Sequence, residues 1–160
     1  QIVPDYGDPA ISAMQYINVS NSDKLLSDFQ SLCLSAKNQN FDIILFPIID
    51  WEFRIQRPQQ LCQEFAKEGM RVIYMSTNME VSDKPGFSVY SSPVDNIFLC
   101  KLHSDVSGIN IHGDILSKET SYFLKESLSI LQSELNIGRS VSLLQHPFWY
   151  QITNHRWKYR

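Results

Sequence analysis

The sequence predicts an α/β domain built on a mainly parallel, doubly wound sheet with helices on both faces. Three observations support this. The apolar run 41–46 is too short for a globular helix, is rich in β-formers and suits a strand buried on both faces. A helical pattern over 58–68 follows it, and 71–75 is a second short apolar run. Strands that alternate with helices in this way favour a parallel sheet.

The segment 58–68 carries clear signals for both helix ends. Pro58 lies where the helix should begin, since the N–H that proline lacks would have no partner inside the helix in its first turn. Gly69 is placed to end it in a left-handed conformation. The apolar stripe of this helix is expected to consist of Leu61 and Phe65, with Cys62 and Ala66 beside them.

The remaining elements follow from similar patterns. Residues 1–21 show no sustained period, so we expect a linker or N-terminal arm, and we assign 22–160 to the domain. A helix is expected from about 22 to 37, and strands 87–90 and 97–102 are expected to form a hairpin-like excursion on one sheet edge. Ser117 should cap a long helix that Gly138 closes. A strand over 140–144 and a helix from Pro147 toward Arg160 complete the domain.

Composition excludes several classes of protein. The 160 residues include 14 Lys+Arg and 17 Asp+Glu, a formal charge of −3, so no global basic field recruits nucleic acid. Three cysteines at spacings unlike zinc motifs predict small buried side chains in a reducing compartment, hence a cytoplasmic location. We expect no metal and no cofactor, and no apolar stretch is long enough to span a bilayer.

Two loops are the main functional indication. In doubly wound sheets, ligands bind outside the carboxyl ends of the strands, where the strand order reverses. Residues 47–57 and 145–149 both follow a strand and enter a proline-started helix, and both are polar and aromatic. The first lacks a glycine-rich phosphate motif, so ordinary dinucleotide or ATP binding is not supported.

Arg54 and Arg57 are candidates to hold a phosphate or carboxylate at the positive end of the helix that starts at Pro58. The competing interpretation is that one of them pairs with Asp50 or Glu52 and merely ties the loop down.

Aromatic residues and histidines leave similar alternatives. Trp51 and Phe53 either stack on a sugar or cover the strand end as a hydrophobic lid, and the lid is favoured. His146 either orients a substrate hydroxyl and stabilises charge, or bonds a neighbouring carbonyl. We expect the other three histidines to be structural or exposed: His103, His112 and His155. The basic, aromatic end 155–160 suits a membrane surface, or more simply a solvated helix end.

Two motifs carry a resemblance to a known family. The run FDIILFPIIDW (41–51), followed by R-x-QRPQQL (54–61) and A-x-x-G-x-RV-x-Y (66–74), resembles the opening unit of group 1 (GT4-type) bacterial glycosyltransferases. LQHPFW (144–149) is similar to a later segment of that subgroup. The resemblance covers residues 41–149.

The resemblance implies a GT-B enzyme with two Rossmann-like domains, of which this chain is the N-terminal, acceptor-side one. It implies metal-independent, retaining transfer of a sugar from a nucleotide-sugar donor to a glycan or lipid-linked acceptor, in the cytoplasm or at the inner face of the membrane. His146 is then the expected catalytic residue. The expected substrate-binding residues are Asp50, Trp51, Arg54, Gln56, Arg57 and Trp149.

One departure from the family pattern matters. The family's donor-binding half carries a paired-glutamate motif, and these 160 residues contain no such domain, so we expect the isolated chain to be inactive. Two alternatives remain: a non-catalytic α/β module that binds a glycan or a protein, and a receiver-like signalling domain. A receiver needs clustered acids after its first strand, and Asp50 stands alone there.

Overall fold

The computed structural model describes residues 22–35 and 41–154. Its helices are α1 (Ser22–Ser35), α2 (Arg57–Lys67), α3 (Lys118–Glu134), the 3-10 turn η2 (Pro147–Trp149) and α4 (Tyr150–Thr153). Its strands are β1 (Asp42–Phe46), β2 (Val72–Met75), β3 (Glu80–Val81), β4 (Phe87–Val94), β5 (Ile97–Ser104) and β6 (Ser140–Leu144). The alternation of strands and helices expected from the sequence is therefore confirmed, and β3 is an addition to it. The expected arm over 1–21 lies outside the described residues.

The strands form one mainly parallel, six-stranded sheet in the order β3-β5-β2-β1-β6, with β4 also paired to β5. β1 is parallel to both β2 and β6, with Ile43 opposite Val72 on one side and Val141 on the other. β4 and β5 are antiparallel, as the expected hairpin requires. However, β5 also pairs in parallel with β2, so it belongs to the body of the sheet and only β4 is an edge addition.

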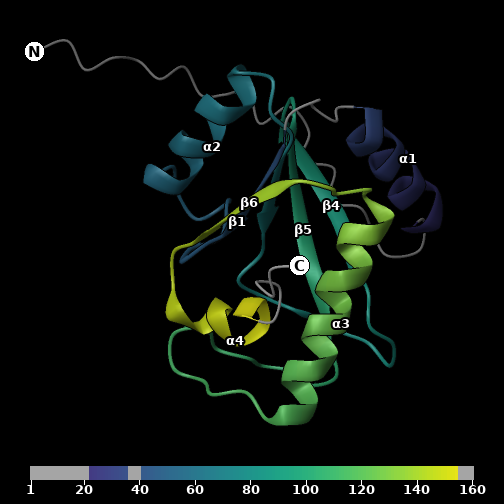
Figure 1. The fold of residues 1–160 in the computed structure, drawn as a ribbon, viewed down its shortest axis with the longest axis vertical. Coiled ribbons are helices and arrows are strands. Elements are labelled where there is room, and N and C mark those ends of the chain that lie inside the picture. The colour runs from purple at the N-terminus through teal and green to yellow at the C-terminus, as the bar shows by residue number, and fades with distance from the viewer. Residues whose placement is uncertain (1–21, 36–40, 155–160) are drawn as a thin grey trace, which may run out of the picture.

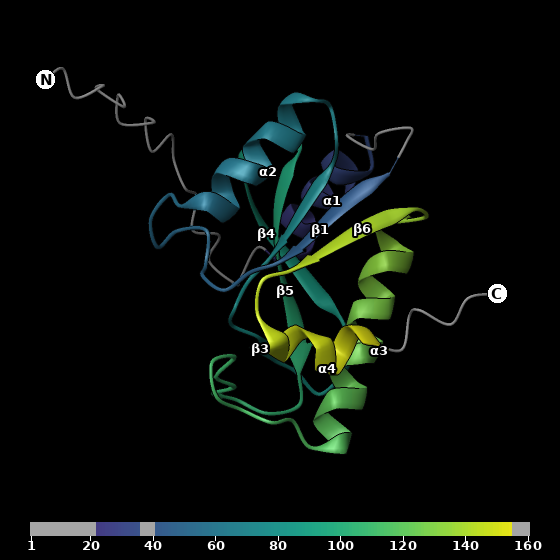
Figure 2. The same cartoon turned by 60° about the vertical axis from the view of Figure 1, so that its left-hand side comes forward.

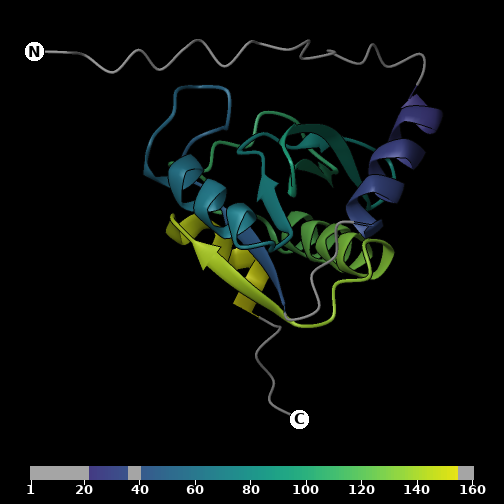
Figure 3. The same cartoon turned by 90° about the horizontal axis from the view of Figure 1, so that it is seen from above.

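Helices cover both faces of this sheet, which makes the fold α/β and Rossmann-like. Alternate residues of each buried strand point to opposite faces. Ile43 and Leu45 pack in one core with Cys62 and Ala66 of α2. The other core holds side chains from α1, α3 and α4 against Ile44, Phe46, Ile73, Met75, Phe98 and Cys100. Figures 1 and 3 show α2 on one side of the sheet and α1 and α3 on the other.

Two details of the helices differ from the sequence-based expectation. Leu61 is 40% exposed, and α2 turns Cys62 and Ala66 to the sheet instead, so the buried stripe lies one residue further along. Ser117 caps α3 as expected, accepting a bond from the Thr120 amide. At its other end, Asn136 adopts the left-handed conformation (φ 51°), so Asn136 and not Gly138 turns the chain out of the helix.

The expected helix from Pro147 is also modified. The chain first makes the tight turn η2 and then the short α4, whose last residue is Thr153. Phe148, Trp149 and Ile152 are buried against the sheet, and Figure 2 shows α4 lying beside α3. The part of this helix expected beyond 154, including His155, lies outside the described residues.

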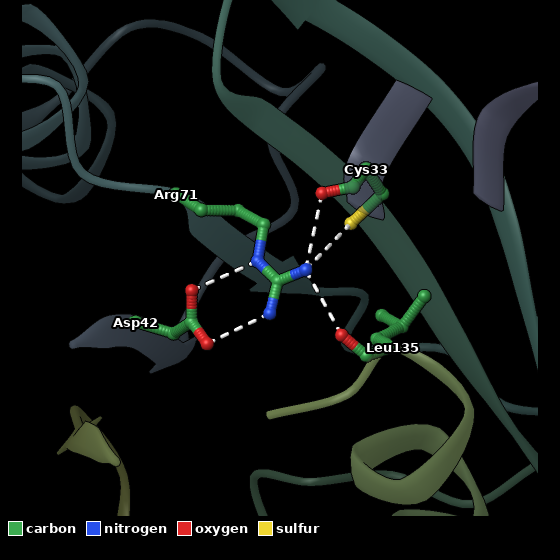
Figure 4. A network of polar contacts seen from close by, with 4 residues as sticks. All are labelled: Cys33, Asp42, Arg71 and Leu135. Carbon is green, nitrogen blue, oxygen red and sulfur yellow. Dashed lines mark hydrogen bonds and ion pairs between the residues drawn. The ribbon is translucent and has the colours of Figure 1, made fainter. Parts of the chain in front are cut away.

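A buried ion pair joins four elements at the amino-terminal edge of the sheet (Figure 4). Arg71 Nε and Nη2 donate to the two carboxylate oxygens of Asp42 at 2.8 and 2.7 Å, and both side chains are essentially inaccessible. Arg71 Nη1 donates to the carbonyl oxygens of Cys33 in α1 (3.0 Å) and Leu135 after α3 (2.9 Å). The guanidinium therefore connects the starts of β1 and β2 to the ends of two helices.

We expect Arg71→Ala to lower the free energy of unfolding by about 3–5 kcal/mol, because it leaves the Asp42 carboxylate buried without a partner. Urea denaturation measures this loss. Lys67→Ala is the matched control, since it breaks the exposed Glu64–Lys67 pair and should cost less than about 1 kcal/mol. If Arg71→Ala fails to fold, the double variant Asp42→Leu/Arg71→Met should recover the fold. Equal losses for Arg71→Ala and Lys67→Ala would contradict the assigned role.

The three cysteines are buried and none forms a disulfide. Burial raises the pKa of the Cys33 thiol to about 11 and that of Cys62 to about 12, and it raises the pKa of Cys100 well above its usual value. Since the thiolate is the reactive form, little of it exists at pH 8. We expect a thiol reagent at pH 8 to modify the native protein very slowly and to titrate all three cysteines in denaturant. Rapid modification of the native protein would show that these thiols are accessible.

Candidate functional site

The two loops singled out by the sequence lie side by side. The Gln145 amide donates to the carbonyl of Phe46, the last residue of β1, at 3.0 Å. Trp149 Nε1 donates to the Pro47 carbonyl at 2.7 Å. β1 connects to β2 through α2 on one face, whereas β6 is reached through α3 on the other, so the strand order reverses between β1 and β6. Both loops named from the sequence therefore meet at this switch point, where doubly wound sheets bind their ligands.

Asp50 holds the first loop to the loop that follows β2. Its carboxylate accepts bonds from the Thr77 amide (2.7 Å), the Thr77 hydroxyl (2.7 Å), the Ser76 hydroxyl (3.0 Å) and Asn78 Nδ2 (2.9 Å). With four donors at this distance, the carboxylate is occupied by the protein itself. The alternative in which an arginine pairs with Asp50 is therefore wrong. The Asp50 side chain instead connects the first loop to the loop that follows β2.

Gln59, which is not among the site residues expected from the sequence, is a second organiser of the same loop. This residue of α2 is fully buried, and its Nε2 donates to the Arg54 carbonyl at 2.9 Å and to the Trp51 carbonyl at 3.3 Å. Its Oε1 accepts from the Gln56 amide at 3.0 Å, as the third residue of a capping box does. A signal for this capping box was present in the sequence, because Gln56 and Gln59 are three residues apart at the start of the helix.

Gln59→Ala should lower the free energy of unfolding by about 1–3 kcal/mol, because it leaves buried carbonyls and the Gln56 amide without partners. The neighbouring Gln60 is exposed, so Gln60→Ala is the matched control and should be close to neutral. Denaturant unfolding compares the two. A loss of similar size in both variants would contradict the role assigned to the Gln59 side chain.

The aromatic residues of the first loop divide between the core and the surface. Trp51 is 9% exposed and meets the ring of Tyr74 edge-on at 5.2 Å, so the interpretation as a hydrophobic lid over the strand end is confirmed for it. Phe53 is 69% exposed and does not cover the strand end. The Arg54 guanidinium lies 5.6 Å from the centre of the Phe53 ring.

Both arginines of the loop are exposed to solvent. Arg54 lies on the loop, and Arg57 is the first residue of α2. Neither makes an ion pair with any other residue in the described ranges, where the salt bridges are Glu64–Lys67, Asp42–Arg71 and Glu80–His103. Gln56 directly precedes α2 as its N-cap. Two cations thus stand at the positive end of an 11-residue helix, beside the switch point.

His146 is half-buried at the start of η2. Its Nδ1 accepts a hydrogen bond from the Phe148 amide at 3.2 Å, in place of the bond to a carbonyl that the alternative interpretation expected. An accepting Nδ1 carries no proton, so the neutral ring has its proton on Nε2 and presents a donor there. Trp149, by contrast, is fully buried against Phe46 and Phe148, and in this conformation none of its surface is open to a ligand. We therefore assign Trp149 to the core.

A third loop completes this edge of the sheet, between β5 and α3. It brings His112 against His146, with the ring centres 5.4 Å apart and the planes nearly perpendicular. A pocket of about 250 Å³ lies there, lined by Ile111, His112, Gly113, Asp114, His146, Pro147, Phe148 and Gln151. From the sequence, His112 is expected to be structural or exposed. It is exposed, but its contact with His146 places it at the site. Its loop follows a parallel strand, and this is the feature that could have indicated its position at the same edge of the sheet.

A larger cavity lies elsewhere. It measures about 600 Å³ and lies between β6, α3 and α4. Of the residues that the structure describes, its lining contains Phe46, Leu128, Gln132, Gly138, Arg139, Ser140, Ser142 and Thr153. Gly138 and Arg139 precede β6, so this cavity extends toward the amino-terminal edge of the sheet. The residues that the sequence and the loops point to lie at the opposite edge.

Among residues 22–35 and 41–154, no three His, Cys, Asp or Glu side chains gather as a metal site. None of the helices described there combines the length and apolar character needed to cross a bilayer. The chain matches no protein-family model, no curated protein and no solved structure. The chemical groups that the site offers to a ligand are exposed guanidinium groups, imidazoles and a carboxylate.

Proposed function

We propose that this chain is the acceptor-side domain of a retaining, metal-independent glycosyltransferase that uses a nucleotide-sugar donor. The observation that carries the proposal is the meeting of loops 47–57 and 145–149 at the switch point, where Arg54, Arg57 and His146 share one edge of the sheet. These loops contain the two motifs that resemble group 1 bacterial glycosyltransferases. The acceptor is a glycan or a lipid-linked sugar, met in the cytoplasm or at the inner face of the membrane.

The arginines suit the phosphate chemistry of such a reaction. A nucleotide-sugar donor and a lipid-linked acceptor both carry phosphate groups, and guanidinium groups bind phosphate with paired, charge-assisted hydrogen bonds. Arg57 is on the first turn of α2, where the helix dipole adds to its positive charge. Asp50 and Gln59 keep the loop in place without a ligand, so little ordering remains to be done on binding.

His146 suits a role beside the transferred sugar. Its Nδ1 is fixed by the Phe148 amide, which holds the ring orientation and leaves Nε2–H as a donor. A fixed donor of this kind stabilises negative charge that develops in a transition state without having to reorganise. We therefore assign His146 as the catalytic residue of this domain, and the donor-binding half of the enzyme as a separate domain.

The second candidate is a non-catalytic α/β module that binds a glycan or a protein. The pocket of about 250 Å³ beside His146 favours this candidate as well, since binding requires no second domain. The two candidates differ in one measurable respect, namely turnover of a nucleotide sugar by the intact protein.

In the intact protein, including any domain encoded after Arg160, we expect Arg57→Ala to lower kcat/KM for sugar transfer about 10- to 100-fold. This is the loss expected for one charge-assisted bond of about 1.5–3 kcal/mol. His146→Asn should lower kcat about 100-fold, and its side-chain oxygen can still accept from the Phe148 amide. A donor screen with product detection by mass spectrometry measures both effects.

The control is Lys67→Ala, which removes an exposed cation at the far end of α2 and should leave transfer unchanged. The thermal unfolding midpoints of all three variants should stay close to that of the parent. The chain 1–160 alone should show no transfer. Transfer by the isolated chain, or full activity in both site variants, would refute the assignment.

A further inference from the structure

The pocket beside His146 has the composition of a binding site for a neutral sugar. His112 and His146 stand at its rim with their rings in edge-to-face contact, and the carboxyl group of Asp114 lines the same space. Ile111 and Phe148 are buried residues that supply its apolar part. Ligand sites of this type combine an apolar surface with a few placed polar groups.

The loop that carries His112 is held from two sides. Asp114 Oδ2 accepts from the Asn110 amide at 2.7 Å, which closes the turn around His112. Gln151 of α4 accepts from the Leu116 amide at 2.9 Å and donates to the Asp114 carbonyl at 3.3 Å. Gln151 therefore ties the loop to the helix that follows His146. Because these bonds use the backbone and one carboxylate oxygen, the imidazole of His112 remains at the surface, where a ligand can reach it.

Charge decides which ligand fits. Within the part of the chain that the structure describes, the lining contains no lysine or arginine and Asp114 supplies a carboxylate, so these residues do not favour a phosphate group. Imidazole N–H donors and a carboxylate acceptor together match vicinal hydroxyl groups, each of which donates one hydrogen bond and accepts others. A volume of about 250 Å³ lies below the range typical of drug-sized ligands and has room for about one ring.

We propose that His112, Asp114 and His146 form a subsite for the hydroxyl groups of a neutral sugar ring, namely the acceptor end of the substrate. The assignment to the acceptor rests on the proposed function, whereas the sugar binding itself does not. Arg54 and Arg57 on the first loop then bind the anionic parts of the substrates, and the third loop binds the sugar ring.

The test is a titration of the 160-residue chain with single neutral methyl glycosides of glucose, galactose and mannose at tens of millimolar. Histidine ring resonances are followed by NMR. We expect at least one glycoside to shift the signals of both His112 and His146 in a saturable way. Asp114→Asn should weaken this binding about tenfold or more, the loss of a hydrogen bond to a charged group. His112→Asn should weaken it about 2- to 10-fold, the loss of a hydrogen bond between neutral groups. Asp114→Asn retains an oxygen for the Asn110 amide, so the loop should keep its turn.

Asp105→Asn is the matched control, because Asp105 is an exposed carboxylate of the same loop that does not line the pocket. The Asp105→Asn variant should bind the glycosides as tightly as the parent chain does. Inorganic phosphate and Zn²⁺ are the competing probes. A saturable shift of His112 by either of them, with none by any glycoside, would overturn the proposal.

The outcome separates this subsite from the proposed function. If glycoside binding depends on His112 and Asp114 but the intact protein transfers no sugar, the subsite is supported and the proposed transferase function is refuted. Sugar transfer by the intact protein with an unchanged acceptor KM in His112→Asn keeps the transferase and removes the subsite.

Discussion

The buried pair of Arg71 and Asp42 is the interaction on which the rest of this fold depends. Its guanidinium reaches two strands and the ends of two helices at the amino-terminal edge of the sheet. Removing two charges from water is costly, and only good geometry with every donor used offsets that cost. Here the carboxylate receives two bonds and the guanidinium also reaches two helix-end carbonyls, which otherwise lack partners. The pair therefore ties the ends of α1 and α3, which pack on the same face of the sheet, to the starts of β1 and β2.

The ion pair stabilises the amino-terminal edge of the sheet, whereas the loops of the candidate site lie at the opposite edge. At the carboxyl edge the loops are long, and side-chain hydrogen bonds order them where glycine-rich loops use the backbone. Asp50 connects the β1 loop to the β2 loop, Gln59 supports it from α2, and Gln151 fastens the β5 loop to α4. Each of these side chains is used by the protein itself, and each leaves a neighbour facing solvent: Arg54, Arg57 or His112. A loop that is ordered before binding loses less entropy when a ligand arrives.

The sequence predicted the sheet well because its strands and helices are local patterns. The apolar runs, Pro58, Gly69 and Ser117 each mark an element from within a few residues. Parallel pairing puts loops 47–57 and 145–149 at the same edge of the sheet, and they meet because β1 and β6 are neighbours. The side-chain roles of three residues have a different origin. Gln59 lies in the expected helix and Arg71 directly precedes β2, but the sequence does not indicate what either side chain binds. Trp149, expected to contact the substrate, is buried in the core. Their roles depend on partners 5 to 102 residues away, such as the carbonyls of Arg54, Leu135 and Pro47, which no local pattern reveals.

His112 shows most clearly why the site needed the structure. The sequence places it in an irregular segment, 34 residues before His146, with nothing in its spacing to connect the two. Parallel pairing of β5 with β2 puts its loop at the same edge as the loops after β1 and β6, and Gln151 then holds that loop beside η2. The consequence is a division of charge along the edge. Exposed guanidinium groups stand on the α2 side, and two imidazoles with one carboxylate stand on the α4 side. A substrate that joins a phosphate to a neutral sugar matches both parts at once, whereas a simple anion matches only the first.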